Sequence, residues 1–295
     1  MDLYDANMET ARRAALHPLA QLDADTRDDG LQAAIRANAA ELAAREAGTR
    51  SGADPEDLHK FRVATRRTRS LLRSTRKLVA DADEGERLRA ELKWLASLLG
   101  EVRDRDVLIA YLLEELETLD GAPFGAVLEL LDEERTRARR ELGVALDSAR
   151  YKALLAALET PPALRPGETL AAAARDEYRR VRKTMSALSD DPADEELHKA
   201  RIRVKRARYA AEAAGSADRF TARAKELQDV LGEHQDAAVA EERVRALLAR
   251  VRGSGRTAFA AGQLVERQRA RRRAARAAWP GAWKRLRKAG DKTFS

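Results

Sequence analysis

The sequence of 295 residues contains no cysteine, few aromatic residues and no long apolar run. The absence of cysteine excludes disulfides, thiol nucleophiles, iron–sulfur clusters and thiolate zinc sites. No apolar stretch approaches the roughly 18 residues that a membrane-spanning helix requires. The first ten residues, MDLYDANMET, are acidic and lack the basic start and apolar core of a secretory signal. From these absences we expect a cytoplasmic protein with no redox role.

The composition predicts helices and a positive surface. Ala, Leu, Arg and Glu are abundant and only 8 proline residues interrupt the chain, which favours long helices. Lys and Arg number 56 against 49 Asp and Glu, and 45 of the positive side chains are Arg. Residues 1–57 carry 6 basic and 12 acidic side chains, whereas residues 262–292 carry 11 basic and 2 acidic ones. This uneven placement favours an anionic partner, although a GC-rich codon bias would also enrich Arg and Ala.

The chain contains an internal repeat. At an offset of 139 residues, EDLHKFRVATRRTR around His59 aligns with EELHKARIRVKRAR around His198. Farther along the offset becomes 132, where ERTRARR at 134–140 aligns with ERQRARR at 266–272. The difference of seven residues is close to two helical turns, so the shorter hairpin keeps the same faces inward. The repeat therefore indicates a duplicated helical unit.

Each unit is predicted to contain four helices. They fall near 30–48, 55–80, 86–119 and 124–158 in the first unit, and near 168–189, 194–214, 218–252 and 257–289 in the second, with Gly and Pro between them. Asp54 with Pro55, and Asp191 with Pro192, are typical helix starts. Helical hairpins with short connections pack as antiparallel bundles. We therefore expect an all-α fold of two tandem four-helix bundles, at 30–160 and 161–295, after an acidic leader at 1–29.

The second helix of each unit carries a stripe of basic residues along one face. The stripes are His59, Arg62, Arg66, Arg69 and Arg73 in the first unit, and His198, Arg201, Lys205 and Arg208 in the second, where Glu212 ends the stripe. Their spacing of three and four residues stacks like charges, which repel by about 0.2–0.5 kcal/mol per pair in an exposed helix. An anion along the stripe would offset this repulsion. A solvated face paired with neighbouring carboxylates is the alternative, but the matched histidines favour an anion. The nearby cations should disfavour protonation of both histidines.

The third and fourth helices add basic residues to the same pattern. Lys93, Gly100 and Asp104 share one face of the third helix, as do Lys225, Gly232 and Asp236 in the second unit, while the fourth helices contribute Arg135, Arg139, Arg267 and Arg271. Gly within a helix costs about 1 kcal/mol relative to Ala, which predicts a close approach of a helix or a ligand at both glycines. The two aspartates are interpreted as acids that orient a guanidinium, with plain interhelical ion pairs as the alternative. Convergence of these faces would line a positive channel, in or between the repeats, in which Arg forks suit phosphate oxygens.

Four segments resemble the CHAD family, the conserved histidine α-helical domain. They are LHKFRVATRRTRSLLR at 58–73, LLGEVRDRDV at 98–107, LHKARIRVKRARY at 197–209 and LGEHQDAAV at 231–239. The resemblance covers about residues 30 to 290. It implies two four-helix bundles related by pseudo-twofold symmetry, whose basic surface and central pore bind inorganic polyphosphate, and an association with polyphosphate granules. The E-x-E-x-K signature of the triphosphate tunnel domain, which is fused to some members, is absent, so we expect a stand-alone CHAD protein.

The resemblance also assigns residues. It implicates His59, Arg62, Arg66, Arg69, Lys93, His198, Arg201, Lys205, Arg208 and Lys225 in polyphosphate binding. The second repeat departs from the first, because Ala237 and Ala238 follow Asp236 where the first has Arg and Asp, and Glu212 replaces Arg73. These departures predict weaker binding by the second repeat.

We therefore predict a polyphosphate-binding protein without catalytic activity, cofactor or bound metal. No H-E-x-x-H, P-loop, dinucleotide loop or nucleophile elbow occurs in the sequence. One alternative is a general polyanion or nucleic-acid binder that uses the basic last helix with Trp279 and Trp283, although aromatics for base stacking are few. The other is a phosphate-chain hydrolase that uses Asp104 and Asp106 with magnesium.

Overall fold

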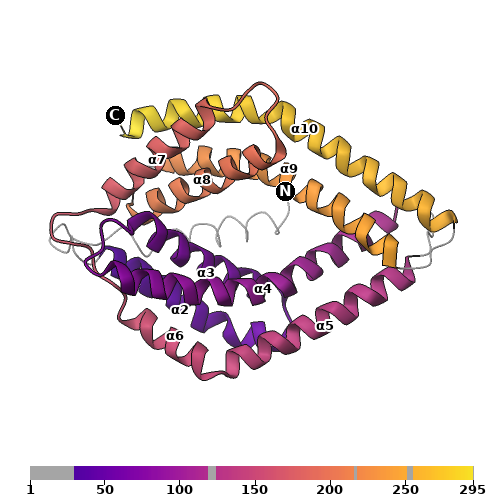
Figure 1. The fold of residues 1–295 in the computed structure, drawn as a ribbon, viewed down its shortest axis with the longest axis horizontal. Helices are drawn as coiled ribbons and strands as arrows, with labels where there is room; N and C mark the ends of the chain where they lie inside the picture. The colour runs from indigo at the N-terminus through magenta and orange to yellow at the C-terminus, as the bar shows by residue number, and fades with distance from the viewer. Residues whose placement is uncertain (1–29, 119–123, 216–217, 251–254, 295) are drawn as a thin grey trace, which may run out of the picture.

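The protein is built from helices throughout the described part of the chain (Figure 1). A computed structural model describes residues 30–118, 124–215, 218–250 and 255–294. Within these ranges no β-strand forms, and the single β-type contact is an isolated antiparallel bridge between Val79 and Leu164. The predicted all-α class is therefore confirmed, whereas the predicted acidic leader at 1–29 lies outside the described residues.

The helices follow the predicted order. They are α2 (Gly30–Ser51), α3 (Pro55–Thr75), α4 (Ala82–Leu116), α5 (Gly125–Asp147), α6 (Ala149–Glu159), α7 (Leu170–Ser186), α8 (Asp194–Ala213), α9 (Asp218–Arg250) and α10 (Gly255–Phe294). The start of α3 is the predicted one, because Asp54 Oδ1 accepts a hydrogen bond from the Glu56 amide at 2.8 Å. The predicted start at Asp191 is wrong: α8 begins after Ala193, and the Asp191 carboxylate instead accepts a hydrogen bond from Arg276.

The fourth helix of the first repeat is divided, which corrects the prediction of one helix over 124–158. Ser148 has an extended backbone between α5 and α6, and its Oγ accepts a hydrogen bond from the Tyr151 amide at 3.2 Å. Pro280 holds the matching position in the second repeat, at the offset of 132, yet α10 continues through it to Phe294. Ser148 caps the start of α6, and the Ala- and Leu-rich flanks give no sign of the break in the sequence.

Three apolar cores hold the helices together. The first packs α2, α3, α4, α6 and the C-terminal part of α5 around residues such as Phe61 and Leu95. The second packs α7, α8, α9 and the C-terminal part of α10 around Phe220 and Leu286. The third lies where the far parts of α4, α5, α9 and α10 meet, at the right of Figure 1, and Leu112 is fully buried there. Because α3 also contacts α8, the two halves are joined on both sides of the middle of the molecule. The division into domains at residue 160 stays a prediction.

Candidate polyanion-binding site

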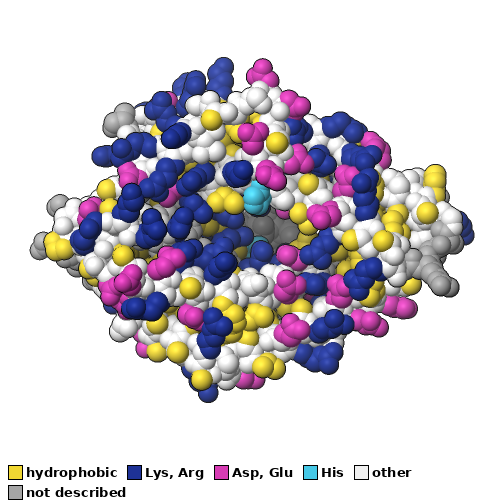
Figure 2. Space-filling view, viewed as in Figure 1, with side chains coloured by type: hydrophobic (Ala, Val, Ile, Leu, Met, Phe, Trp, Pro, Cys, Tyr) yellow, Lys and Arg dark blue, Asp and Glu magenta, His cyan; other side chains and the backbone are white. Residues whose placement is uncertain are grey.

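The two basic stripes lie on helices that contact each other across the two halves of the molecule. One face of α3 is buried in the first core through Leu58, Phe61 and Leu72, which leaves the stripe at the side of the helix. On α8 the apolar positions Leu197 and Val204 are buried in the second core in the same way. Figure 2 shows Lys and Arg side chains gathered mainly at the left of a hollow between the half that holds α3 and the half that holds α8, with acidic and basic side chains mixed at its right.

Five side chains form what we call the α3–α8 cluster: Arg62, Arg66 and Arg69 from α3, and Arg201 and Lys205 from α8. Burial, together with the charges of the four arginines, lowers the pKa of the Lys205 ammonium to about 7. Burial also lowers the pKa of Arg62, and the charges of Arg66 and Arg201 act in the same direction. Because α3 contacts α8, the charges of the two stripes repel across the repeats.

The cluster is poorly neutralised. Among the described residues, no carboxylate lies within 4 Å of Arg66, Arg69, Arg201 or Lys205, and Arg62 Nη2 lies 3.8 Å from Asp104 Oδ1. Arg66 Nε and Arg201 Nε are buried and have no hydrogen-bond partner there. A buried donor without a partner costs about 1–3 kcal/mol. An anionic acceptor in the cluster would supply the missing hydrogen bonds and offset the repulsion.

The two helical glycines have similar surroundings in both repeats. A Cβ at Gly100 would lie 3.9 Å from Arg62 Nη2, and a Cβ at Gly232 would lie 3.4 Å from Arg201 Nε and Nη2. Both are ordinary van der Waals distances, so each glycine lies against a guanidinium of the cluster but a Cβ would also fit there. Asp104 contacts Arg62, which fits both the predicted orienting role and the alternative of a plain interhelical ion pair. Asp236 makes no ion pair within 4 Å in the described chain, and burial raises its pKa, although the charge of Arg201 opposes this rise.

The two matched histidines differ in their surroundings. His59 is half-buried, and burial lowers its pKa, with the charges of Arg103, Arg66 and Arg62 adding to the effect although Glu56 opposes it. This agrees with the expectation that His59 is neutral near pH 7. His198 is exposed, and its Nδ1 lies 2.9 Å from Gln235 Oε1. Both histidines sit near the N-terminal ends of their helices, at the start of the stripes.

Most of the remaining predicted residues already have acidic partners. Arg208 contacts Glu212, Arg135 and Arg139 contact Asp106, Arg267 contacts Glu115, Arg271 contacts Glu233, and Lys225 contacts Asp229. These six therefore differ from Arg66, Arg69, Arg201 and Lys205 of the α3–α8 cluster in having a carboxylate partner. Lys93 is exposed and makes no ion pair within the described ranges. Arg73 faces a different hollow from the cluster.

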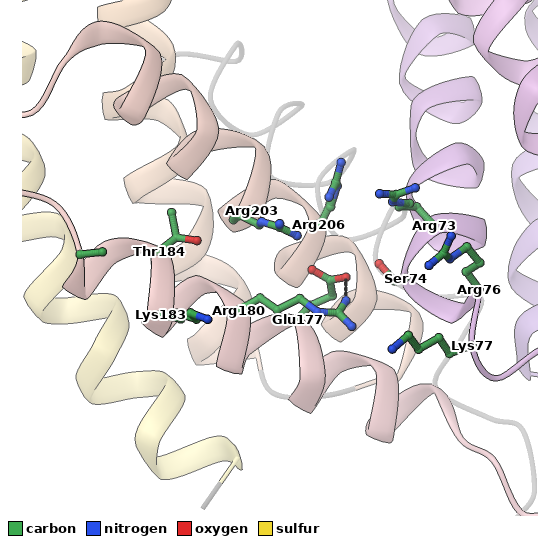
Figure 3. A pocket seen from close by; sticks show the side chains of 11 residues that line it. Arg73, Ser74, Arg76, Lys77, Glu177, Arg180, Lys183, Thr184, Arg203 and Arg206 are labelled. Carbon is green, nitrogen blue, oxygen red and sulfur yellow. Dashed lines mark hydrogen bonds and ion pairs between the residues drawn. The ribbon is translucent and has the colours of Figure 1, made fainter.

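That hollow is a basic pocket that the sequence did not indicate (Figure 3). Its volume is about 530 Å³, and it lies between the C-terminal end of α3, α7 and α8. It is lined by Arg73, Ser74, Arg76, Lys77, Glu177, Arg180, Lys183, Thr184, Ala187, Arg203 and Arg206. The available signal was the RRVRK run at 179–183, which has no counterpart in the first repeat and so does not appear in a comparison of the repeats.

Most features behind the two alternative functions are engaged in packing, whereas Asp104 is exposed. Asp106 is buried and contacts Arg139 at 3.2 Å and Arg135 at 3.8 Å. In the part of the chain that the structure describes, no group of three or more metal-ligating side chains comes together. Trp279 is buried in the second core and Trp283 packs against it. None of the helices in the described ranges is long and apolar enough to cross a bilayer.

The fold and the site define an all-helical protein whose two halves bring basic stripes together. The family model of the CHAD domain matches residues 33–245. The chain therefore belongs to the CHAD family, which is reported in general to bind polyphosphate. Two uncharacterized proteins of Mycobacterium tuberculosis, MT2285 and Rv2226, are each 37% identical over 231 residues. The match covers 72% of this chain and 44% of each relative, so the chain spans less than half the length of these proteins.

Two solved structures are similar in fold. PptA from Streptomyces chartreusis matches with a TM-score of 0.73 and 29% identity, over 87% of this chain and 98% of PptA. The CHAD domain from the plant Ricinus communis matches with a TM-score of 0.66 and 26% identity, over 88% of this chain and 96% of that domain. The similarity includes both halves of the chain, which agrees with an arrangement in which the two repeats form one structure.

Proposed function

We propose that this protein binds inorganic polyphosphate through the α3–α8 cluster. The observation that carries the proposal is the pair of buried Nε donors of Arg66 and Arg201, which lack hydrogen-bond partners beside unpaired cations. A phosphate chain offers repeated oxygen acceptors that Arg binds with two hydrogen bonds. Membership of the CHAD family supports the same ligand. The hollow between the halves would then be the path along which the chain lies.

The first test is the binding of labelled long-chain polyphosphate at low and at moderate salt, in competition with excess DNA and with heparin. We expect tight binding that survives both competitors, because the cluster is a fixed arrangement rather than diffuse surface charge. The logarithm of the binding constant should fall linearly with the logarithm of the salt concentration, by analogy with counterion release from nucleic acids. Equal displacement by all three polyanions would instead show general polyanion binding.

A variant with a matched control locates the site. Arg66→Gln/Arg201→Gln removes the two unpartnered guanidinium groups, and we expect a loss of affinity of at least about tenfold because charged hydrogen bonds are lost. The control is Arg137→Gln/Arg140→Gln on α5, where both arginines are exposed and form no ion pair within the described residues. It removes the same charge and should change the affinity less than threefold. Similar losses in both variants would contradict a site in the cluster.

We also propose that binding occurs without hydrolysis. Asp104 and Asp106, the acids of the hydrolase alternative, contact Arg62 and Arg139, which supports a role in holding arginines. Incubation with polyphosphate and magnesium should release no orthophosphate above the rate without protein. Release that depends on added metal would revive the enzyme alternative. Association with polyphosphate granules is part of the proposal, and co-sedimentation of the chain with isolated granules would test it.

A further inference from the structure

A second basic site lies beside the α3–α8 cluster, in the pocket between α3, α7 and α8. Seven of its eleven lining residues are Lys or Arg and one, Glu177, is acidic. Figure 3 shows Arg73, Arg76 and Lys77 reaching in from the end of α3, and the other basic side chains reaching in from α7 and α8 on the opposite side. The cations of three separate segments therefore face one volume.

Most of these cations lack an acidic partner. Within the described ranges, Arg180 forms an ion pair with Glu177, and none of the other six cations has a carboxylate within 4 Å. Burial lowers the pKa of Arg206, and the charges of Arg203, Arg73 and Arg180 add to this effect although Glu177 opposes it. The cations thus repel one another across the pocket, and a bound anion would relieve this repulsion.

Glu177 shows that the pocket is organised by more than exposed charge. Its side chain is 1% exposed, and its Oε1 accepts a hydrogen bond from Arg180 Nη1. A buried carboxylate fixes that guanidinium at the wall of the pocket, because moving it would leave the carboxylate without a donor. The pocket therefore holds at least one Arg in place before any ligand arrives.

The pocket is formed by α3 of the first repeat with α7 and α8 of the second, and the repeat-related positions do not form a matching basic pocket. At the offset of 139, Arg73, Arg180 and Lys183 correspond to Glu212, Glu41 and Ala44. Glu212 on α8 and Glu41 on α2 pair with Arg208 and Arg45, so these repeat-related positions are neutralised. The basic stripe of α3 consequently continues through Arg73 into a charged pocket, whereas the stripe of α8 ends at a carboxylate.

We propose that this pocket is a second phosphate site, which binds a linear oligophosphate of at least three units. A single orthophosphate carries about two charges and would leave most of the cations unpaired, whereas a chain of phosphates can contact α3, α7 and α8 together. The oligophosphate is either free or the end of a polymer that lies along the α3 stripe. Binding of a polymer end rests on the proposed function of the α3–α8 cluster, whereas binding of a free oligophosphate does not.

The binding test uses inorganic tripolyphosphate and the full chain carrying Arg66→Gln/Arg201→Gln, which weakens the α3–α8 cluster. We expect this background to bind one equivalent in titration calorimetry. Adding Arg76→Glu/Lys183→Glu, both exposed positions in the pocket, should weaken binding at least tenfold. Adding Arg140→Glu/Lys152→Glu, an equal charge change at exposed positions of α5 and α6, should weaken it less than threefold. Equal losses in the two variants, or no binding by the background, would overturn the proposal.

Lysine footprinting of the unmodified sequence tests the same site without substitutions. Tripolyphosphate should slow the acetylation of Lys77 and Lys183, which line the pocket, at least threefold relative to exposed Lys152. Lys205 reports on the α3–α8 cluster, so protection there without protection of Lys77 and Lys183 would overturn the pocket alone. Protection of the pocket lysines without protection of Lys205 would support the pocket and contradict the cluster. With long-chain polyphosphate, joint protection of all three would identify the polymer end as the source, and protection by tripolyphosphate only would identify the free oligophosphate.

Discussion

Arg201 on α8 lies directly against Gly232 on α9, with Nε and Nη2 3.4 Å from the place that a Cβ would occupy. Arg62 and Gly100 have the corresponding relationship in the first repeat, at 3.9 Å from Nη2. Each glycine thus lies in van der Waals contact with a guanidinium of the cluster, and the two helices give up helix propensity at these positions.

Substitutions at these two glycines should affect polyphosphate affinity and the free energy of unfolding differently. Gly232→Leu should move the Arg201 guanidinium and weaken polyphosphate binding on the order of tenfold, as one charged hydrogen-bonding group is misplaced. Gly100→Ala should raise the free energy of unfolding in urea by up to about 1 kcal/mol, since Ala favours the helix, and leave binding within twofold. Gly143→Leu is the control, because nothing lies within 4 Å of a Cβ there. Equal binding by Gly232→Leu and Gly143→Leu would show that Gly232 does not help to place the Arg201 guanidinium.

The low pKa of Lys205 predicts proton uptake on binding. Burial and four arginines hold this pKa at about 7, against an ordinary value of 10.5, so Lys205 is largely neutral at pH 8.5. A polyanion favours the charged ammonium and should raise its pKa. The affinity should then fall as pH rises above 7, by up to about tenfold per pH unit, and calorimetry in buffers of different ionisation enthalpy should show proton uptake at pH 8.5. Lys205→Arg should bind without this uptake, and an unchanged uptake would assign it to another group.

The lowered pKa of Lys205 also makes the free energy of unfolding depend on pH, because Lys205 has its ordinary pKa in the unfolded chain. Between about pH 7 and 10.5 the unfolded state binds more protons at Lys205 than the folded state does. The contribution of this residue to the free energy of unfolding should therefore rise with pH across that window. Lys205→Met removes the buried ammonium, so its stability relative to the parent should be greatest below pH 7 and should decline above it. Urea titrations at pH 6.5 and 9 measure this difference, and a constant difference would contradict the shift.

Glu212 is expected to restrain binding by the second repeat. It contacts Arg208 at 2.7 Å and Arg67 at 3.9 Å, and its place in the first repeat is held by Arg73. Glu212→Gln should release both arginines and increase the affinity for polyphosphate severalfold, with a loss of about 0.5 kcal/mol in unfolding free energy. Binding and urea titrations measure both quantities. Glu195→Gln, which alters an exposed pair with Lys199 on the same helix, is the control for charge, and an equal gain there would remove the special role of Glu212.

The Ser148 hydroxyl caps α6 at the break between α5 and α6. Ser148 Oγ accepts a hydrogen bond from the Tyr151 amide at 3.2 Å and donates to the Ala145 carbonyl at 2.6 Å. Ser148→Ala should lower the free energy of unfolding by about 1 kcal/mol, as for other N-cap losses. Ser189→Ala, in the exposed segment before α8, should have no measurable effect in the same urea titration. Equal free energies of unfolding for the two variants would show that the Ser148 cap does not stabilise the protein.

Sequence comparison between the repeats located the basic residues of the α3–α8 cluster, but it did not show which other predicted basic residues have carboxylate partners. The spacing of Arg62, Arg66 and Arg69 on one helical face follows from the geometry of the helix, and so it could be derived from residue numbers alone. Whether a basic residue has a carboxylate partner depends on other helices. Arg139 lies four residues after Arg135, and Arg271 lies four residues after Arg267, which is a spacing also found in the stripes. Asp106 and Glu233 nevertheless pair with Arg139 and Arg271.

The basic pocket escaped detection for a related reason. Its residues come from the end of α3 and from α7 and α8, which lie about a hundred positions apart in the sequence and share no repeat pattern. A search based on similarity between the repeats selects what the repeats have in common. Arg73 and Arg180 are opposed by Glu212 and Glu41 at the matching positions, so this search passes over the feature that distinguishes the halves.

The sequence by itself determined the helical class, the duplication, the family and the faces of α3 and α8 that carry charge, because helix propensity and a period of 3.6 residues are local properties of the chain. The tertiary structure decided which of those charges remain unpaired, since ion pairs such as that of Arg139 with Asp106 join residues 33 positions apart. It also decided where two halves meet and where α7 completes a pocket. Long-range packing sets the distances between helices, and those distances determine whether a stripe of arginines is neutralised or left to bind an anion.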